Sequence, residues 1–242
     1  MIFHDLQYIT DLVKNTQVMS DPLDILITNV ILHKHSPNDI CEFGTGNGAW
    51  ALTQFKSGII DSRYMLLDNF SWHKMGWIGH RFWPKNSAEL VDYINKQTSN
   101  SMNFDVIDVE AKDYINEMSV CDVIRVDIDM EFQLLHEVID KLTDNGVLLM
   151  DDVVFNMGLN RIVNLIDLKR AGKIFPLWIG NKESAWTINE SYRDHLYEIT
   201  TTALSEQYDF GLSLLNEKTL NPDRWKYFTT REHNFFKKFT SM

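Results

Sequence analysis

The chain has 242 residues, of which 44% are hydrophobic, 24% charged and 12% aromatic. This composition predicts a globular domain and argues against a disordered or fibrous chain. Because 34 acidic residues face 23 Lys and Arg residues, the formal charge is −11, which repels phosphate backbones and argues against nucleic acid as the main partner. Two cysteines, Cys41 and Cys121, exclude a disulfide framework and a cysteine-rich zinc site.

Two sequence features indicate where in the cell the protein is found: the character of the N-terminal segment and the length of the apolar stretches. The segment MIFHDLQYITDLVK carries an acid early and lacks a basic start followed by an apolar run, so we expect no signal peptide. No stretch reaches the roughly 18 consecutive apolar residues of a membrane helix. We therefore expect a cytoplasmic protein without a membrane partner.

Apolar periodicity predicts alternating helices and strands along most of the chain. Two helices come first, at residues 5–18 and 22–33. Strands are then expected at 39–43, 64–67, 103–107, 123–126 and 147–150, with helices between them at 49–56, 86–96, 111–118 and 131–142. A turn is expected at residues 144–146. Short apolar strands that alternate with helices are typical of a Rossmann-like α/β fold, a doubly wound parallel sheet with helices on both faces.

Beyond residue 156 the pattern predicts one more helix, at 159–170, and a closing β-pair at 174–179 and 184–188. We expect residues 1–190 to form the main domain and residues 191–242 a helical and aromatic extension packed on it. Cations and aromatic side chains in that extension could bind a second copy of the chain, which would make a homo-oligomer, or an anionic substrate. Packing against the core is the favoured interpretation.

Alternating glycines follow the first predicted strand, in the segment from Glu42 to Gly48 (EFGTGNG). Such glycines let the backbone turn tightly and approach a ligand more closely than a Cβ would allow. The acid before them repels a pyrophosphate but pairs well with an ammonium group. Asp68 ends the second strand, where a carboxylate can accept hydrogen bonds from both hydroxyls of a ribose.

This combination of glycines and two acids resembles the class I S-adenosylmethionine-dependent methyltransferases. The resemblance implies that Glu42 lies near the amine of the methionine part and Asp68 on the ribose. The other implied cofactor-binding residues are Gly44, Thr45, Gly46, Gly48 and Asn69. Near the end of the third strand, Asp108 and Glu110 compete for a place beside the adenine amine, and for each a solvated loop acid is an equally good interpretation.

Carboxylates gather at the ends of two further strands. Asp127 and Asp129 end the fourth strand, and Asp151 and Asp152 end the fifth. In a parallel sheet these ends share one edge with the glycine turn, and like charges held that close need a cation. Oxygens of Asp127, Asp151 and Asp152 suit Mg²⁺ or a similar hard ion. The alternative is that one Asp caps the next segment and water solvates the others; the two pairs together favour the metal.

The segments 125–129 (RVDID) and 142–152 (LTDNGVLLMDD) resemble the macrocin O-methyltransferase (TylF-like) family of metal-dependent sugar O-methyltransferases. The resemblance covers about residues 40–170. It implies that Asp127, Asp151 and Asp152 hold the ion and that Asp129 takes the proton of the acceptor hydroxyl. Ile128 stands where the family has Gly. Because a β-branched residue resists positive φ, we expect this turn to follow a different path and to aim Asp129 differently.

Residues 71–84 (SWHKMGWIGHRFWP) are irregular, aromatic and weakly basic. They predict either a lid over the cofactor or a loop packed by its aromatic side chains, and within them His73 and His80 are alternative bases. The sequence thus predicts a metal-assisted O-methyltransferase that uses S-adenosylmethionine and acts on a hydroxyl of a small molecule such as a sugar. A metal-free methyltransferase and a non-catalytic domain that binds a nucleoside or a protein partner remain alternatives.

Overall fold

A computed structural model of the chain describes residues 6–16, 18, 20, 22–71, 82–152, 159–180 and 182–207. Most of the segment expected to form a lid, including His73 and His80, lies outside the described residues. So does the part of the expected C-terminal extension that follows residue 207.

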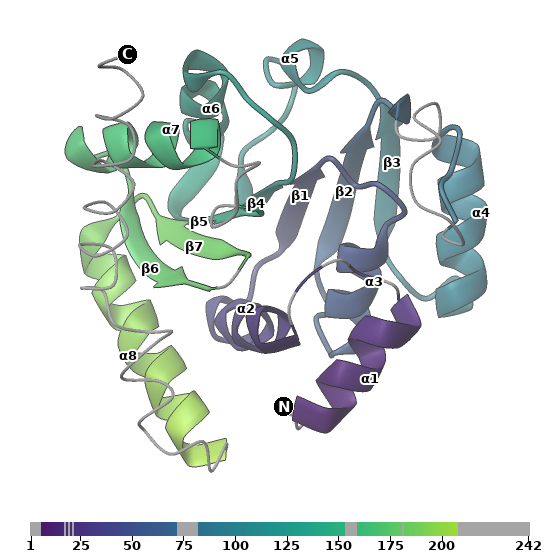
Figure 1. Cartoon of the computed structure of the whole chain (residues 1–242), viewed down its shortest axis with the longest axis horizontal. Helices are drawn as coiled ribbons and strands as arrows, with labels where there is room; N and C mark the ends of the chain where they lie inside the picture. The colour runs from purple at the N-terminus through teal and green to yellow at the C-terminus, as the bar shows by residue number, and fades with distance from the viewer. Residues whose placement is uncertain are drawn as a thin grey trace, which may run out of the picture.

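A seven-stranded sheet organises the molecule (Figure 1). Its strands are β1 (Asp39–Phe43), β2 (Arg63–Asp68), β3 (Phe104–Asp108), β4 (Cys121–Val126), β5 (Leu142–Met150), β6 (Phe175–Ile179) and β7 (Ser184–Thr187). They lie in the order β3-β2-β1-β4-β5-β7-β6. The first five are parallel, and β7 runs antiparallel to both β5 and β6. The predicted Rossmann-like fold class and the closing β-pair are confirmed.

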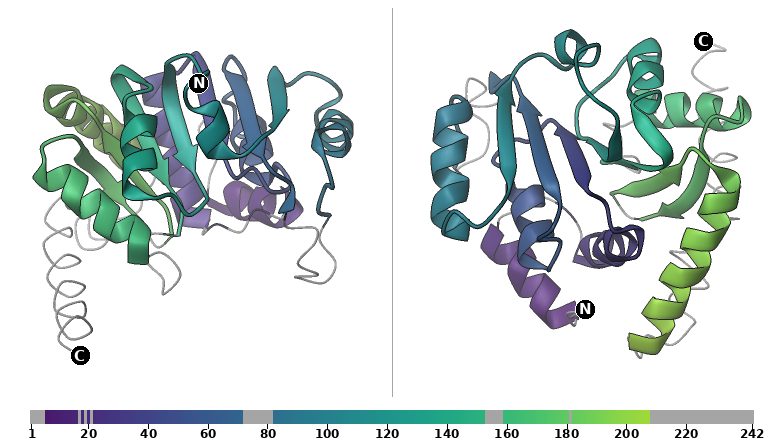
Figure 2. Two further views of the ribbon diagram at one scale, coloured as in Figure 1. Left: turned by 90° about the horizontal axis from the view of Figure 1, so that it is seen from above. Right: turned by 180° about the vertical axis from the view of Figure 1, so that it is seen from behind.

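Two apolar layers cover the sheet because side chains alternate along each strand. In β1, for example, Ile40 joins one core cluster and Cys41 joins the other. Helices α1 (Leu6–Thr16), α2 (Pro22–His35), α3 (Ala49–Lys56), α4 (Ser87–Thr98) and α8 (Glu190–Gln207) contribute to the first cluster. The second takes in α5 (Ala111–Tyr114), α6 (Phe132–Ile139) and α7 (Leu159–Arg170). Figure 2 shows α4 beside edge strand β3 and α8 beside edge strand β6.

The predicted turn at residues 144–146 is wrong as a separate element, because these residues belong to β5. Leu142 pairs with Cys121 and Val147 pairs with Val123, so the residues between them form an irregularity within the strand. Gly146 permits it, since a Cβ there would lie 2.6 Å from the Cβ of Leu142. The helices predicted at 111–118 and 131–142 are also shorter than expected and end at Tyr114 and Ile139.

The carboxyl ends of the parallel strands bring together the glycine turn after β1, Asp68 at the end of β2 and the acids that follow β4 and β5. Open α/β sheets bind their ligands at this edge. Among the described residues, no helix has the length and apolar character needed to cross a membrane.

Candidate functional site

The glycine turn between β1 and α3 has left-handed backbone at all three glycines, with φ of 84° at Gly44, 59° at Gly46 and 72° at Gly48. Gly44 is also enclosed, because a Cβ there would lie 2.5 Å from Cγ2 of Ile128 and 2.8 Å from the carbonyl oxygen of Asp127. Around Gly46 the nearest atom belongs to the ring of Trp83, at 3.3 Å from the position of a Cβ. The turn is therefore bounded by the segment after β4 on one side and by Trp83 on another.

Asp68 fastens this turn to the second strand. Its Oδ2 accepts a hydrogen bond from the backbone N–H of Gly46 at 2.7 Å, and its Oδ1 accepts one from Phe70 at 2.6 Å. The side chain is largely buried, and this burial raises the pKa of the Asp68 carboxyl, while the two backbone donors act in the opposite direction. A carboxylate has about four acceptor sites, so Asp68 can receive further donors from a ligand.

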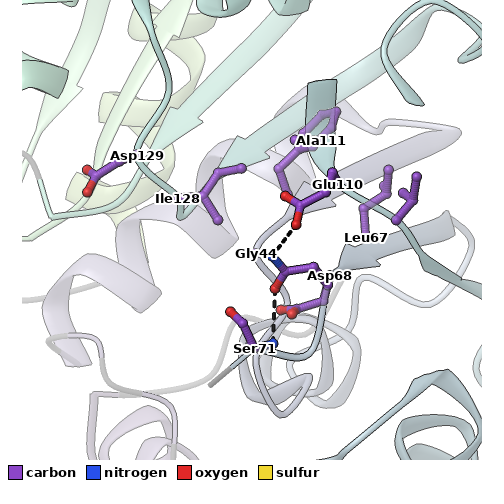
Figure 3. Close-up of a pocket in the computed structure, with 11 residues that line it drawn as sticks. Gly44, Leu67, Asp68, Ser71, Glu110, Ala111, Ile128 and Asp129 are labelled. Atoms are coloured by element: carbon purple, nitrogen blue, oxygen red, sulfur yellow. Dashed lines mark hydrogen bonds between the residues drawn. The ribbon is translucent and has the colours of Figure 1, made fainter. Parts of the chain in front are cut away.

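A pocket of about 210 Å³ opens beside Asp68 (Figure 3). Asn69 links its walls by donating from Nδ2 to Oε1 of Glu110 at 2.9 Å, while its Oδ1 accepts from the N–H of Ser71 at 3.0 Å. Asp129 lies across Ile128 from Asp68 and Glu110. The pocket is lined by Phe43, Gly44, Leu67, Asp68, Asn69, Ser71, Val109, Glu110, Ala111, Ile128 and Asp129.

The predicted cofactor residues divide into two groups. Gly44, Asp68, Asn69 and Glu110 line the pocket. The pocket lining does not include the other five, which are Glu42, Thr45, Gly46, Gly48 and Asp108. The Thr45 hydroxyl donates to the carbonyl of Leu67, and a Cβ on Gly48 would meet Ile94 and Leu90. The exposed Asp108 pairs in register with Asp68. Of the two acids near the end of β3, the pocket thus contains Glu110.

Arg125, near the end of β4, is 2% exposed and lies at the centre of a buried ion network. Its NH1 contacts Oε1 of Glu42 at 2.7 Å and Oδ2 of Asp127 at 3.2 Å. Its NH2 contacts Oδ2 of Asp151 at 2.9 Å and Oε1 of Glu183 at 3.3 Å. One guanidinium therefore joins carboxylates from four different segments of the sheet edge.

Glu42 lies within this network rather than in the pocket wall. Burial, helped by the neighbouring charges of Glu183 and Asp68, raises its pKa to about 8 even though Arg125 favours the ionised form. Oε2 of Glu42 is buried and has no hydrogen-bond partner among the described residues. A buried acceptor without a donor is costly, and the raised pKa relieves that cost because a protonated carboxyl no longer leaves a charged oxygen without a partner.

Asp127, Asp151 and Asp152 form the predicted cluster, each offering one oxygen within 4.8 Å of the others. Carboxylate oxygens at this spacing fit a hard divalent ion. Burial raises the pKa of Asp127, and the charge of Asp151 contributes to that rise. Cations of the chain also reach the cluster: besides Arg125, Lys182 Nζ lies 3.3 Å from Oδ1 of Asp152.

Asp129 does not join this cluster. Its side chain is 75% exposed, and its Oδ1 lies 3.3 Å from Nε of Arg161. Arg161 also donates from NH1 to the carbonyl of Asp151 at 2.8 Å, which ties α7 to the end of β5. Ile128 avoids positive φ, and Ile128 and the exposed Asp129 both line the pocket.

Sequence reasoning missed the positive side chains of this edge. Arg125 stands between Ile124 and Val126 in the buried half of the strand CDVIRV, and a charge at such a position is itself a signal of a buried partner. Lys182 and Glu183 lie in the turn before β7, and charged residues are so common in turns that they give no signal of a site there. The sequence places Trp83 in the aromatic segment, but its position beside Gly46 follows only from the fold.

A scan against protein-family models finds no match, and a search of curated proteins finds none either. Solved structures do match. The SAH-bound methyltransferase PaMTH1 from Podospora anserina is 16% identical, with a TM-score of 0.56 over 77% of this chain and 89% of that chain. A methyltransferase from Geobacter sulfurreducens is 12% identical, with a TM-score of 0.52 over 78% and 91%. An O-methyltransferase from Bacillus cereus in complex with SAH is 11% identical, with a TM-score of 0.51 over 78% and 93%.

The chain has the class I methyltransferase fold. In this class I methyltransferase fold the glycine turn, the pocket and the carboxylate cluster all lie at the carboxyl edge of the sheet, where doubly wound folds place their ligands.

Proposed function

We propose that this protein is an S-adenosylmethionine-dependent O-methyltransferase that acts on a hydroxyl of a small molecule such as a sugar. The pocket carries the proposal, because it combines Asp68, Asn69 and Glu110 at one end with Asp129 at the other. The solved structures with the same fold support it, because they are methyltransferases and two of them hold bound SAH.

Each part of the site then has a role toward the cofactor. Asp68 accepts hydrogen bonds from the ribose hydroxyls, Asn69 and Glu110 lie beside the base, and the glycine turn lets the backbone approach the ligand. Glu42, through its unpartnered Oε2, receives the ammonium of the methionine part. When bound, S-adenosylmethionine supplies a sulfonium methyl group that is already a reactive donor.

Asp129 would accept the proton of the acceptor hydroxyl, and bound S-adenosylmethionine would supply the methyl group, so that the products would be a methyl ether and SAH. The carboxylate then returns its proton to water, which its 75% exposure permits. Arg161 orients Asp129 through the contact between Nε and Oδ1. A positioned carboxylate of this kind contributes roughly 10²- to 10⁴-fold to the rate.

The proposal includes a divalent ion such as Mg²⁺, which Asp127, Asp151 and Asp152 would hold, as the resemblance to the TylF-like family implies. Such an ion lowers the pKa of a hydroxyl near it. Transfer without a metal is the competing proposal, and the pairing of Arg125 and Lys182 with the same carboxylates favours it. Acceptor turnover measured with Mn²⁺ and with EDTA separates the two.

Cofactor binding is tested by calorimetry with SAH. Asp68→Asn removes a charged acceptor and should weaken binding by about 1.5–3 kcal/mol, or roughly 10- to 150-fold. Asp108→Asn is the matched control, because this exposed acid is the register partner of Asp68 but does not line the pocket. No heat with wild-type protein at millimolar SAH would refute the proposal. An equal loss of SAH affinity in Asp68→Asn and Asp108→Asn would show that Asp68 has no specific role in binding the cofactor.

A further inference from the structure

Lys182 lies in the turn between β6 and β7, and hydrogen bonds to Asp24 of α2 hold that turn in place. The backbone N–H groups of Lys182 and Glu183 both donate to Oδ2 of Asp24, at 2.6 and 3.2 Å, and Asp24 is fully buried in the first turn of α2. Gly180 packs against the same carboxylate so closely that a Cβ would overlap Oδ1. The backbone at Lys182 therefore has a fixed position at the edge of the carboxylate cluster.

The side chain of Lys182 reaches Asp152 from this anchored backbone. Nζ lies 3.3 Å from Oδ1 of Asp152, and the two side chains are similarly accessible, at 31% and 27%. Asp152 is one of the three carboxylates whose oxygens lie within 4.8 Å of one another. A cation of the chain thus already sits on one of the oxygens that a divalent ion would need.

The cations of this edge differ in how far they can move. Arg125 is 2% exposed and held by four carboxylates, so it stays in place whatever binds. Lys182 has an ammonium on a flexible four-carbon stem, and its accessibility lets that group swing into water. Among the described residues, Arg161 also contacts the cluster, 3.7 Å from Oδ1 of Asp127, but its side chain is only 9% exposed. Of these three cations, the lysine is therefore the one that can leave its carboxylate for water without uncovering a buried charge.

We propose that Lys182 is a tethered counter-ion, which neutralises Asp152 while no divalent ion is present and is displaced from it when the ion binds. The lysine and the ion compete for one carboxylate, so the ammonium weakens metal binding and favours release of the ion. This rests on the proposed metal site at Asp127, Asp151 and Asp152. It concerns a residue on the β6–β7 turn that the metal site itself does not include.

Removing the ammonium should tighten metal binding by roughly tenfold, between the small effect of an exposed ion pair and the larger one of a buried pair. Mn²⁺ binding is measured by electron paramagnetic resonance and by calorimetry, without cofactor or acceptor. The variants are Lys182→Met and Lys182→Gln, which lose the charge, and Lys182→Arg, which keeps it. Lys96→Met is the control, because it removes one positive charge from an exposed pair with Asp92 on α4, away from the cluster.

We expect tighter Mn²⁺ binding in Lys182→Met and Lys182→Gln and wild-type binding in Lys182→Arg and Lys96→Met. Equal affinity in wild type and in both uncharged variants would overturn the counter-ion while leaving the metal site intact. Tightening in Lys96→Met as well would also overturn it, because net charge would then explain the effect. If neither the wild type nor any variant binds Mn²⁺, both the metal site and this inference are refuted. SAH binding in the same samples tests the methyltransferase proposal separately.

Discussion

Replacing Arg125 by Met would leave four carboxylates at the sheet edge without their shared cation. Glu42, Asp127, Asp151 and Glu183 contact its guanidinium at 2.7–3.3 Å, and Arg125 itself is 2% exposed. Breaking a buried ion pair by removing one partner costs about 3–5 kcal/mol of unfolding free energy. For a domain of this size each kcal/mol lowers Tm by about 2–4 °C. We therefore expect Arg125→Met to lower Tm by about 6–20 °C.

The assay is thermal unfolding followed by circular dichroism, and the matched control is Arg63→Met. Arg63 pairs with Asp105 across β2 and β3, but both side chains are about half exposed, at 50% and 54%. An exposed pair contributes about 0–1 kcal/mol, so this control should lose less than about 4 °C. Both variants lose one arginine from a strand, but the ion pairs of Arg125 are buried and the ion pair of Arg63 is exposed.

The pH dependence adds a second readout. Burial raises the pKa of Glu42 to about 8 and also raises the pKa values of Asp127 and Glu183, so these carboxyls take up protons as the pH falls. A protonated acid no longer needs the guanidinium, so the Tm loss in Arg125→Met should be smaller at pH 6 than at pH 8.5. A loss no larger than that of Arg63→Met, or one that grows toward low pH, would refute the reasoning.

Two further predictions concern single acids of the site. The pKa of Glu42 is about 8 in the folded chain and near 4.5 in an unfolded one, so the protonated residue stabilises the ligand-free protein at low pH, and this stabilisation is lost as the pH rises through 8. Glu42→Gln should therefore flatten the dependence of Tm on pH between pH 5 and 8.5, and an unchanged slope would contradict this. Asp129→Ala should reduce turnover roughly 10²- to 10⁴-fold while SAH affinity stays within about twofold, and full turnover in this variant would remove Asp129 from the mechanism.

Local patterns were enough to predict the elements that position the site. The alternation of apolar residues fixed the parallel strands, and the glycines after Phe43 marked the turn at the end of β1. Because parallel strands end at one edge, the meeting of Asp127, Asp151 and Asp152 could also be predicted. The turn expected at residues 144–146 differs from the structure, because the turn-forming sequence Asp-Asn-Gly is accommodated as an irregularity inside β5, between the pairs that Leu142 and Val147 make with β4.

The ion network could not be predicted, because its members are distant in the sequence. Glu42 and Arg125 are 83 residues apart, and Arg125 and Glu183 are 58 apart. Their contacts depend on the register of β1, β4 and β7 and on which way each side chain faces, and no local pattern contains that information. The position of Lys182 depends in the same way on a distant residue, because Asp24 of α2 accepts a hydrogen bond from its backbone N–H and so anchors the β6–β7 turn.

Gly44 and Ile128 have unequal freedom to change during evolution. Gly44 is restricted twice, by its φ of 84° and by the carbonyl oxygen of Asp127, so replacing Ile128 would not make room for a side chain at position 44. Ile128 is partly exposed, avoids positive φ and lines the pocket. Divergent copies of this chain should therefore keep glycine at 44 and vary at 128, and a library of substitutions at 128 would reshape the ligand site with the glycine turn left intact.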